Sequence, residues 1–143
     1  MRAPTHMLGG VLVAALLPHA SIAGLAAAGL GALLPDVDHP RSTLGRMLPG
    51  SGLLYWTVGH RTVTHGLAAL GLLWALTRGL PAPVHAGLVA GFVSHLMLDA
   101  LSGGVPLLWP VGSRLRLPSV PEWLAAPALA FGTVLVWRGG GVV

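Results

Sequence analysis

The chain has 143 residues, of which 54% are hydrophobic and only 8% are charged, whereas soluble domains carry about 25% charged residues. A mean hydropathy of +0.77 therefore excludes an ordinary soluble domain and predicts a membrane protein. Cysteine is absent, which excludes disulfides and thiolate metal sites. The net charge of +4 comes from arginine alone, and the arginines are scattered between apolar runs, a distribution that disfavours binding of nucleic acid.

Five apolar segments, each bounded by proline, glycine or charge, are predicted as helices, because a bilayer leaves unpaired backbone groups unsatisfied. In chain order they cover residues 5–17, 20–34, 64–78, 83–101 and 121–137. Glycine and alanine recur in the second and fourth segments, which predicts close packing between helices. We expect one all-α domain over residues 1–143, a small polytopic membrane helical bundle of about five helices, with the first segment retained as structure rather than removed as a signal peptide.

The first two segments could form one long span or a short hairpin that turns at residues 17–19. Only residues 83–101 approach the length of about 20 residues that a spanning helix needs. A single span would place His6 and Asp36 on opposite membrane faces, whereas a hairpin would bring them to the same face. We favour the hairpin, because one metal could then bind both residues.

With a hairpin, the N-terminus and the loops 35–63 and 102–120 share one side of the membrane. Six of the eight arginines lie on that side, and two lie on the other. The positive-inside rule then predicts that this side faces the cytoplasm. The six are Arg2, Arg41, Arg46, Arg61, Arg114 and Arg116.

Three of the four acids and most of the histidines lie at the ends of apolar segments. An ionisable side chain near hydrocarbon is costly unless it meets a partner, and a shared metal would satisfy all of them. The candidate metal ligands are His6, Asp36, Asp38, His39, His60, His65, His95 and Asp99. His19 and His85 lie at the opposite ends of their segments and are expected to be structural.

The sharpest local pattern is the pair His95 and Asp99, which are four residues apart and therefore share one face of a helix. After the helix break at Pro35, an extended segment would direct Asp36 and Asp38 the same way. His39 follows in the same turn, held in a non-helical conformation by the next proline.

His60 and His65 are too far apart around a helix to share a face, so one is expected to precede the helix that begins near Thr62 or Thr64. Arg61, between the two histidines, could bind a phosphate or carboxylate with its planar guanidinium. It could equally be an anchor at the membrane surface.

The segments THMLGG, LLPDVDHPRS, GHRTVTHG and HLMLDALSGGVPLLWP resemble the YdjM-like family of membrane-bound, predicted metal-dependent hydrolases. Their order and spacing cover most of residues 5–110. The resemblance implies a small bacterial or archaeal membrane protein with a His/Asp metal centre. By motif matching, the family's polar positions fall on the eight candidate ligands, with Arg61 and Thr64 beside them. The histidine pattern is also similar to the ligand pattern of zinc-dependent phospholipases C.

Eight ligands exceed what one tetrahedral zinc binds, so we expect two or more divalent ions, zinc first and manganese or iron as alternatives. The expected function is metal-dependent hydrolysis of a phosphoester or ester in a membrane lipid or lipid-linked substrate, at one membrane face. Asp36 or His39 could instead act as a general base, and Arg61 could bind the substrate. A metal-ion carrier or sensor, or a non-catalytic subunit stabilised by metal, stays open as an alternative.

Overall fold

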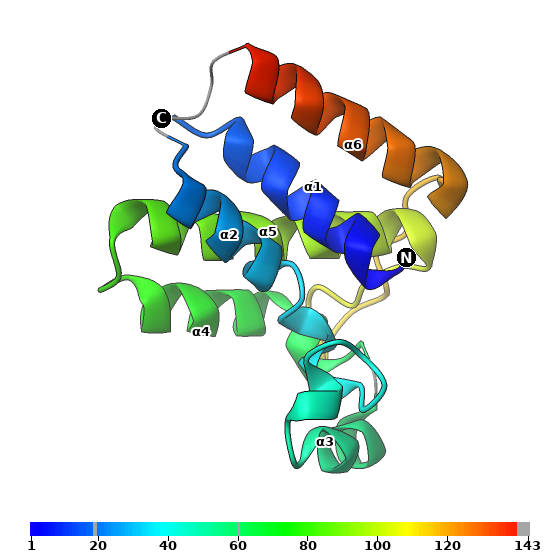
Figure 1. Ribbon diagram of the computed structural model, residues 1–143. Helices are drawn as coiled ribbons and strands as arrows, with labels where there is room; N and C mark the ends of the chain where they lie inside the picture. Colours follow the sequence, from blue (N-terminus) through cyan, green and yellow to red (C-terminus); the bar gives the residue numbers. More distant parts are fainter. Residues whose placement is uncertain (19, 60, 140–143) are drawn as a thin grey trace.

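The computed structural model describes residues 1–18, 20–59 and 61–139. Within these residues the chain is all-helical, with six α-helices, three short 3-10 helices and no strand, which confirms the predicted fold class (Figure 1). The α-helices are α1 (Ala3–Ala15), α2 (Ile22–Gly31), α3 (Ser51–Val58), α4 (Leu67–Thr77), α5 (Ala82–Ser102) and α6 (Glu122–Arg138). The 3-10 helices are η1 (Pro35–Asp38), η2 (Gly45–Met47) and η3 (Val63–His65).

Five of the six α-helices correspond to the five predicted segments, because the helix-breaking residues read from the sequence act where expected. The hydroxyl of Ser21 accepts a hydrogen bond from the Gly24 amide and caps α2. A proline lies in the first turn of both α1 and α5, where its missing N–H leaves no helical bond unmade. The helix predicted from residue 64 begins at Leu67 instead, since the preceding residues form η3.

Residues 35–63 were predicted to form a loop, which is wrong for the part that forms α3. Gly50, with φ +109°, adopts the left-handed conformation that leads the chain into this helix. The helix has only eight residues, and Trp56 and Leu53 on it are largely exposed. Such a short apolar run carries too few turns to give a recognisable helical pattern.

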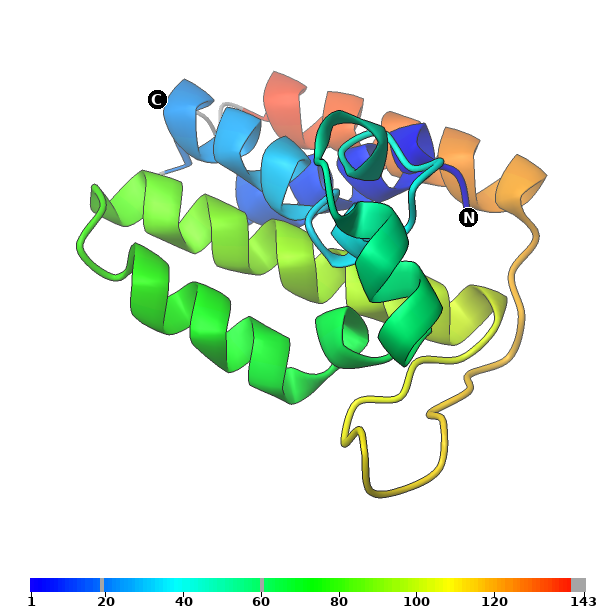
Figure 2. The ribbon, with the colours of Figure 1, turned by 90° about the horizontal axis from the view of Figure 1, so that it is seen from below.

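Helix α5 is the central element, in contact with α1, α2 and α4, while α6 packs on the far side of α1 (Figures 1 and 2). The predicted close packing occurs between α2 and α5. A Cβ atom on Gly87 would collide with the Gly24 carbonyl, and one on Gly91 would collide with the Ala28 carbonyl. Small residues therefore let the two backbones approach each other directly.

The N-terminal segments form the predicted hairpin. Helices α1 and α2 are separate and pack side by side (Figures 1 and 2). The hairpin brings His6, near the start of α1, and Asp36, just after α2, to the same end of the bundle. Both lie within 4 Å of side chains in the C-terminal half of α5.

By length and composition, α5 is the one helix of the described residues that could cross a membrane. Helices α1 and α4 are apolar but shorter. Large apolar side chains on α4 and α6, among them Leu76, Phe131 and Trp137, are more than half exposed, as expected of surfaces that face lipid. Several membrane crossings stay a prediction.

Candidate metal centre

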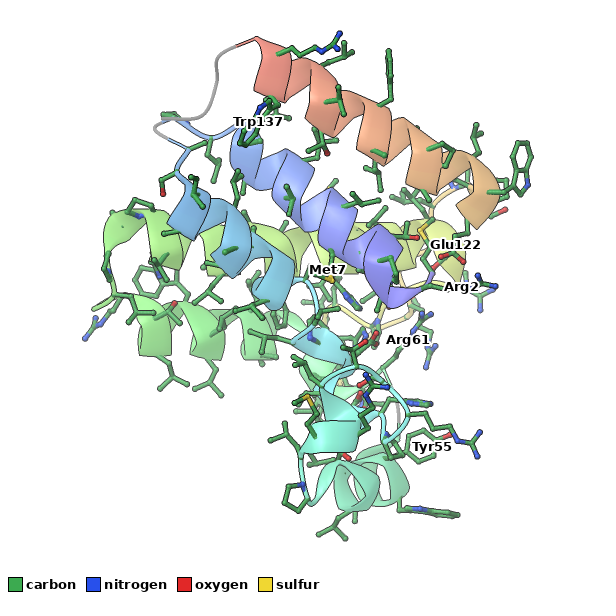
Figure 3. All side chains as sticks on the ribbon, viewed as in Figure 1. Arg2, Met7, Tyr55, Arg61, Glu122 and Trp137 are labelled. Atoms are coloured by element: carbon green, nitrogen blue, oxygen red, sulfur yellow. The ribbon has the colours of Figure 1, made fainter. Side chains whose placement is uncertain are left out.

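The cluster of ionisable side chains lies where the start of α1, η1, η3 and the C-terminal half of α5 meet. Figure 3 shows Arg61 at this junction, between the helical bundle and the segment that carries α3. His6, His65, His95 and Asp99 are each at most 1% exposed. Four segments that are distant in sequence thus enclose one buried polar region.

The Nε2 atoms of two imidazoles and one oxygen from each of two carboxylates lie at the spacing of neighbouring metal ligands. The Nε2 atoms of His65 and His95 are 3.3 Å apart. Asp99 Oδ2 lies 3.3 Å from His65 Nε2 and 3.4 Å from His95 Nε2, and Asp36 Oδ1 lies 3.5 and 3.7 Å from the same two atoms. Ligand atoms bound tetrahedrally to zinc at about 2.05 Å lie about 3.3 Å from one another. These five distances match the spacing of ligand atoms around zinc. Asp36, His65 and His95 form one candidate ligand group, and Asp99 lies next to both of its imidazoles.

Hydrogen bonds on the outer edge of both imidazoles orient them toward this centre. His95 Nδ1 lies 2.7 Å from the Ala32 carbonyl oxygen and must donate to it. Thr64 Oγ1 donates to Asp38 Oδ2 at 2.9 Å and accepts from His65 Nδ1 at 2.9 Å. Both Nδ1 atoms then carry the proton, which leaves both Nε2 lone pairs facing the carboxylates. Metal-binding histidines in proteins are commonly held in this way.

Asp36 and His65, the two members of this set outside α5, shift each other's pKa. Burial alone would lower the pKa of His65, but the carboxylates of Asp36 and Asp99 outweigh it and raise the pKa above its usual value. Burial alone would raise the pKa of Asp36, but His65 and His95 hold the pKa at about 2. Two carboxylates beside the same pair of imidazoles favour positive charge between them, from protons or from a metal ion.

His6 extends the cluster on the other side of Asp99. Its ring stacks on His95 with centroids 3.8 Å apart, and its Nε2 lies 3.6 Å from Asp99 Oδ1. Neither ring nitrogen of His6 has a hydrogen-bond partner in the described part of the chain. His6, His95 and Asp99 form a second candidate ligand group, which shares His95 with the first. His95 Nδ1 is bonded to the Ala32 carbonyl, so only Nε2 is available to bind metal. His95 therefore cannot bind an ion in each group at the same time.

Arg61 contacts the cluster directly through Asp99. Its Nη2 donates to Asp99 Oδ1 at 2.8 Å, so the two oxygens of this carboxylate face different partners. Arg61 is also the only residue other than glycine with a positive φ, +57°, among those described. This conformation costs about 1–2 kcal/mol for a residue with a Cβ. The backbone is thus strained at the residue whose guanidinium binds Asp99.

The remaining predicted site residues lie around this centre rather than in it. Asp38 is buried and reaches His65 through Thr64. His39 Nδ1 accepts a hydrogen bond from the Arg41 amide, and its ring meets Tyr55 edge-on. Neither Asp38 nor His39 belongs to the two ligand groups found among the described residues. His60 and His19 lie outside the described residues.

Two contributions to the site were missed or left without a role by the sequence analysis. Thr64 was noted only as a neighbour, although a hydroxyl beside a candidate ligand is a usable signal for an orienting residue. The partner that orients His95 is the backbone carbonyl of Ala32, and a backbone group cannot be recognised from the residue types in a sequence. His85 bonds to Thr77 at the opposite end of α5, as expected of a structural histidine.

The fold and the cluster define a small all-helical protein with one described helix long enough to cross a membrane and with buried histidine and aspartate side chains at one end of its bundle. The family model described as YdjM inner membrane protein matches residues 1–143, and the chain belongs to this family. The Inner membrane protein YdjM of Escherichia coli (strain K12) is 37% identical over 137 residues, covering 82% of this chain and 70% of that protein. The protein of the same name from Shigella flexneri gives the same values.

A further relative is the Uncharacterized protein YvsG of Bacillus subtilis (strain 168), which is 38% identical over 126 residues and covers 82% of this chain and 79% of that protein. No solved structure matches the chain significantly. The family therefore supports a location in the bacterial inner membrane.

Proposed function

We propose that the protein is a metal-dependent hydrolase embedded in the membrane, acting on a phosphoester or ester bond of a lipid or lipid-linked substrate. The observation that carries the proposal is that Asp36 Oδ1 and Asp99 Oδ2 each lie 3.3–3.7 Å from both His65 Nε2 and His95 Nε2, which are themselves 3.3 Å apart. Two imidazoles and two carboxylates are a set that zinc accepts readily, and manganese or iron also bind such ligands.

We propose first a single ion bound by His65 and His95 Nε2, with oxygens of Asp36 and Asp99 as its candidate carboxylate ligands. The expectation of two or more ions stays a prediction. A second ion would depend on His6 and on the outer oxygen of Asp99, which Arg61 already contacts. When bound, a divalent ion in this set supplies Lewis acidity for hydrolysis.

The chain's own residues hold and shield this centre. Thr64 and the Ala32 carbonyl fix the two imidazoles, and Arg61 holds one oxygen of Asp99. Asp36 is the accessible member, with 22% of its side chain exposed against 0% for Asp99. Substrate would therefore approach from the side of Asp36, which could act as the general base in place of binding metal. His39 stays a predicted alternative for that role, and a cytoplasmic orientation of this side stays a prediction from the arginine distribution.

Two other functions use the same ligands. A carrier or sensor would bind the ion transiently, and ligands of a carrier are expected at several depths along a path. Here five candidate ligands gather at one end of α5, and His85 at the other end is engaged by Thr77. This arrangement favours an enzyme over a carrier. A non-catalytic subunit in which metal only locks the bundle would show the same geometry and needs an activity measurement.

The first experiment is elemental analysis of protein purified in detergent, comparing wild type with His65→Ala and with His85→Ala as the matched control. Wild type and His85→Ala should carry stoichiometric metal, and His65→Ala should lose it. Hydrolysis of phosphoester and ester bonds in bacterial lipid extracts is then measured with the same proteins. Metal without hydrolysis of any lipid would support the non-catalytic subunit, and wild type without metal would refute the proposal.

A further inference from the structure

Two arginines pack against adjacent glycines of the turn that ends α5, beside the candidate metal centre. The amides of Gly103 and Gly104 both donate to the Asp99 carbonyl, at 3.0 and 2.8 Å, so the turn begins directly behind that ligand. A Cβ on Gly103 would lie 3.0 Å from Arg61 Nη1. A Cβ on Gly104, whose φ is +89°, would lie 2.6 Å from Arg116 Cγ and 3.1 Å from its Nε. The absence of side chains on this turn makes room for both arginines.

Arg116 is fixed in place by the backbone around it. The Leu115 and Val105 amides and carbonyls form two reciprocal hydrogen bonds of 2.9 Å, and the Leu117 amide donates to the Ala100 carbonyl at 2.9 Å. Residues 115–117 are thereby held along the end of α5. Arg116 lines a cavity of about 200 Å³ together with Ser102, Ser119 and the two glycines of the turn.

The guanidinium of Arg116 has donors to offer an anion in this cavity. The ion pairs found for arginines in the described part join Arg2 to Glu122 and Arg61 to Asp99. Arg116 is exposed, and the buried Nε of Arg61 has no partner among the described residues. Guanidinium and hydroxyl donors around one cavity are the chemistry that recognises a phosphate group.

A second cavity, which is apolar, adjoins this one, and Ala100 and Leu117 line both. The apolar cavity has a volume of about 270 Å³. It is lined by side chains of α4, α5 and the segment 105–117, including Leu70, Leu96 and Leu115. A ligand that fills both would have a phosphate at one end and a hydrocarbon chain at the other.

We propose that Arg116 binds the phosphate of a lipid phosphoester in the cavity beside Gly103 and Gly104, with the lipid chain in the adjoining apolar cavity. Arg61 connects this site to the candidate metal centre, because it touches both the turn and Asp99. The inference rests on the proposed function and narrows it, since it selects a phosphoester over a carboxyl ester.

The test measures binding rather than turnover, with full-length protein in a detergent without phosphate. Isothermal titration calorimetry is carried out with a short-chain phosphatidic acid, with inorganic phosphate and with the matching diacylglycerol. The variant is Arg116→Gln, and the matched control is Arg114→Gln, an exposed arginine two residues earlier on the same segment. Metal content is determined on every sample.

Phosphatidic acid should bind wild type more tightly than either inorganic phosphate or diacylglycerol. Arg116→Gln should weaken that binding by about tenfold or more, as expected for a charge-assisted bond, and Arg114→Gln should change it by less than about twofold. Equal effects of the two substitutions would overturn the site. Equal affinity for inorganic phosphate and phosphatidic acid would overturn the lipid ligand in favour of free phosphate. Wild type without metal would refute the metal centre separately, because these binding results do not depend on it.

Discussion

Replacing Thr64 by valine tests how the candidate metal centre is oriented. The hydroxyl links His65 Nδ1 to Asp38 Oδ2 through two contacts of 2.9 Å, and valine has nearly the same shape without the hydroxyl. The imidazole then loses the partner that keeps its Nε2 lone pair directed at the centre. Loss of such a partner lowers metal affinity by about 10- to 100-fold. Because Asp38 is buried, the same change should cost about 1–3 kcal/mol of stability.

The affinity is measured by competition between the purified protein and a zinc chelator of known strength. Thr77→Val is the matched control, because Thr77 makes the same kind of contact with His85, 2.8 Å from hydroxyl to Nδ1, at the far end of α5. The control should bind zinc as wild type does, although it also loses a hydrogen bond. If Thr64→Val kept wild-type affinity, or if Thr77→Val lost as much, the reasoning that Thr64 orients a metal ligand would be refuted.

Three further predictions concern packing, pH and metal removal. Gly91→Ala should destabilise the protein by about 1–3 kcal/mol in thermal unfolding in detergent, since the new Cβ meets the Ala28 carbonyl, whereas Gly71→Ala, with open space around it, should not. The carboxylate of Glu122 accepts hydrogen bonds from the Thr5 hydroxyl and the Arg2 amide, which lower its pKa below 4.5. The ionised Glu122 therefore stabilises the fold fully above pH 4.5, and this stabilisation is lost as the pH falls through the lower pKa of the folded state. Glu122→Gln should flatten the acid side of the curve of melting temperature against pH. An unchanged curve would contradict this. Removing metal with a chelator should lower the melting temperature and adding zinc should restore it, and a melting temperature indifferent to both would count against a bound ion.

Much of the fold could be predicted because apolar runs and helix breakers are local signals. The pair His95 and Asp99 was also predictable, since four residues on a helix fix a shared face. The hairpin was favoured for a chemical reason, the need to bring His6 and Asp36 together, and the structure contains it.

The selection among the eight candidate ligands could not be predicted. Which side chains converge depends on how α1, η1 and η3 cross α5, and no local pattern encodes these crossings. Asp38 and Asp36 lie two residues apart, yet Asp38 bonds to Thr64 while Asp36 faces the two imidazoles. An extended turn would have directed both carboxylates the same way, but Pro35–Asp38 is a 3-10 helix, which turns them apart.

The most direct test of the account is X-ray absorption spectroscopy at the metal edge of the protein purified with its native ion. The account predicts a shell of two imidazole nitrogens and two carboxylate oxygens at about 2.0–2.2 Å for zinc, with His95→Ala losing the ion while His85→Ala retains it. A protein without stoichiometric metal, or a bound metal whose spectrum contains no imidazole, would contradict the account.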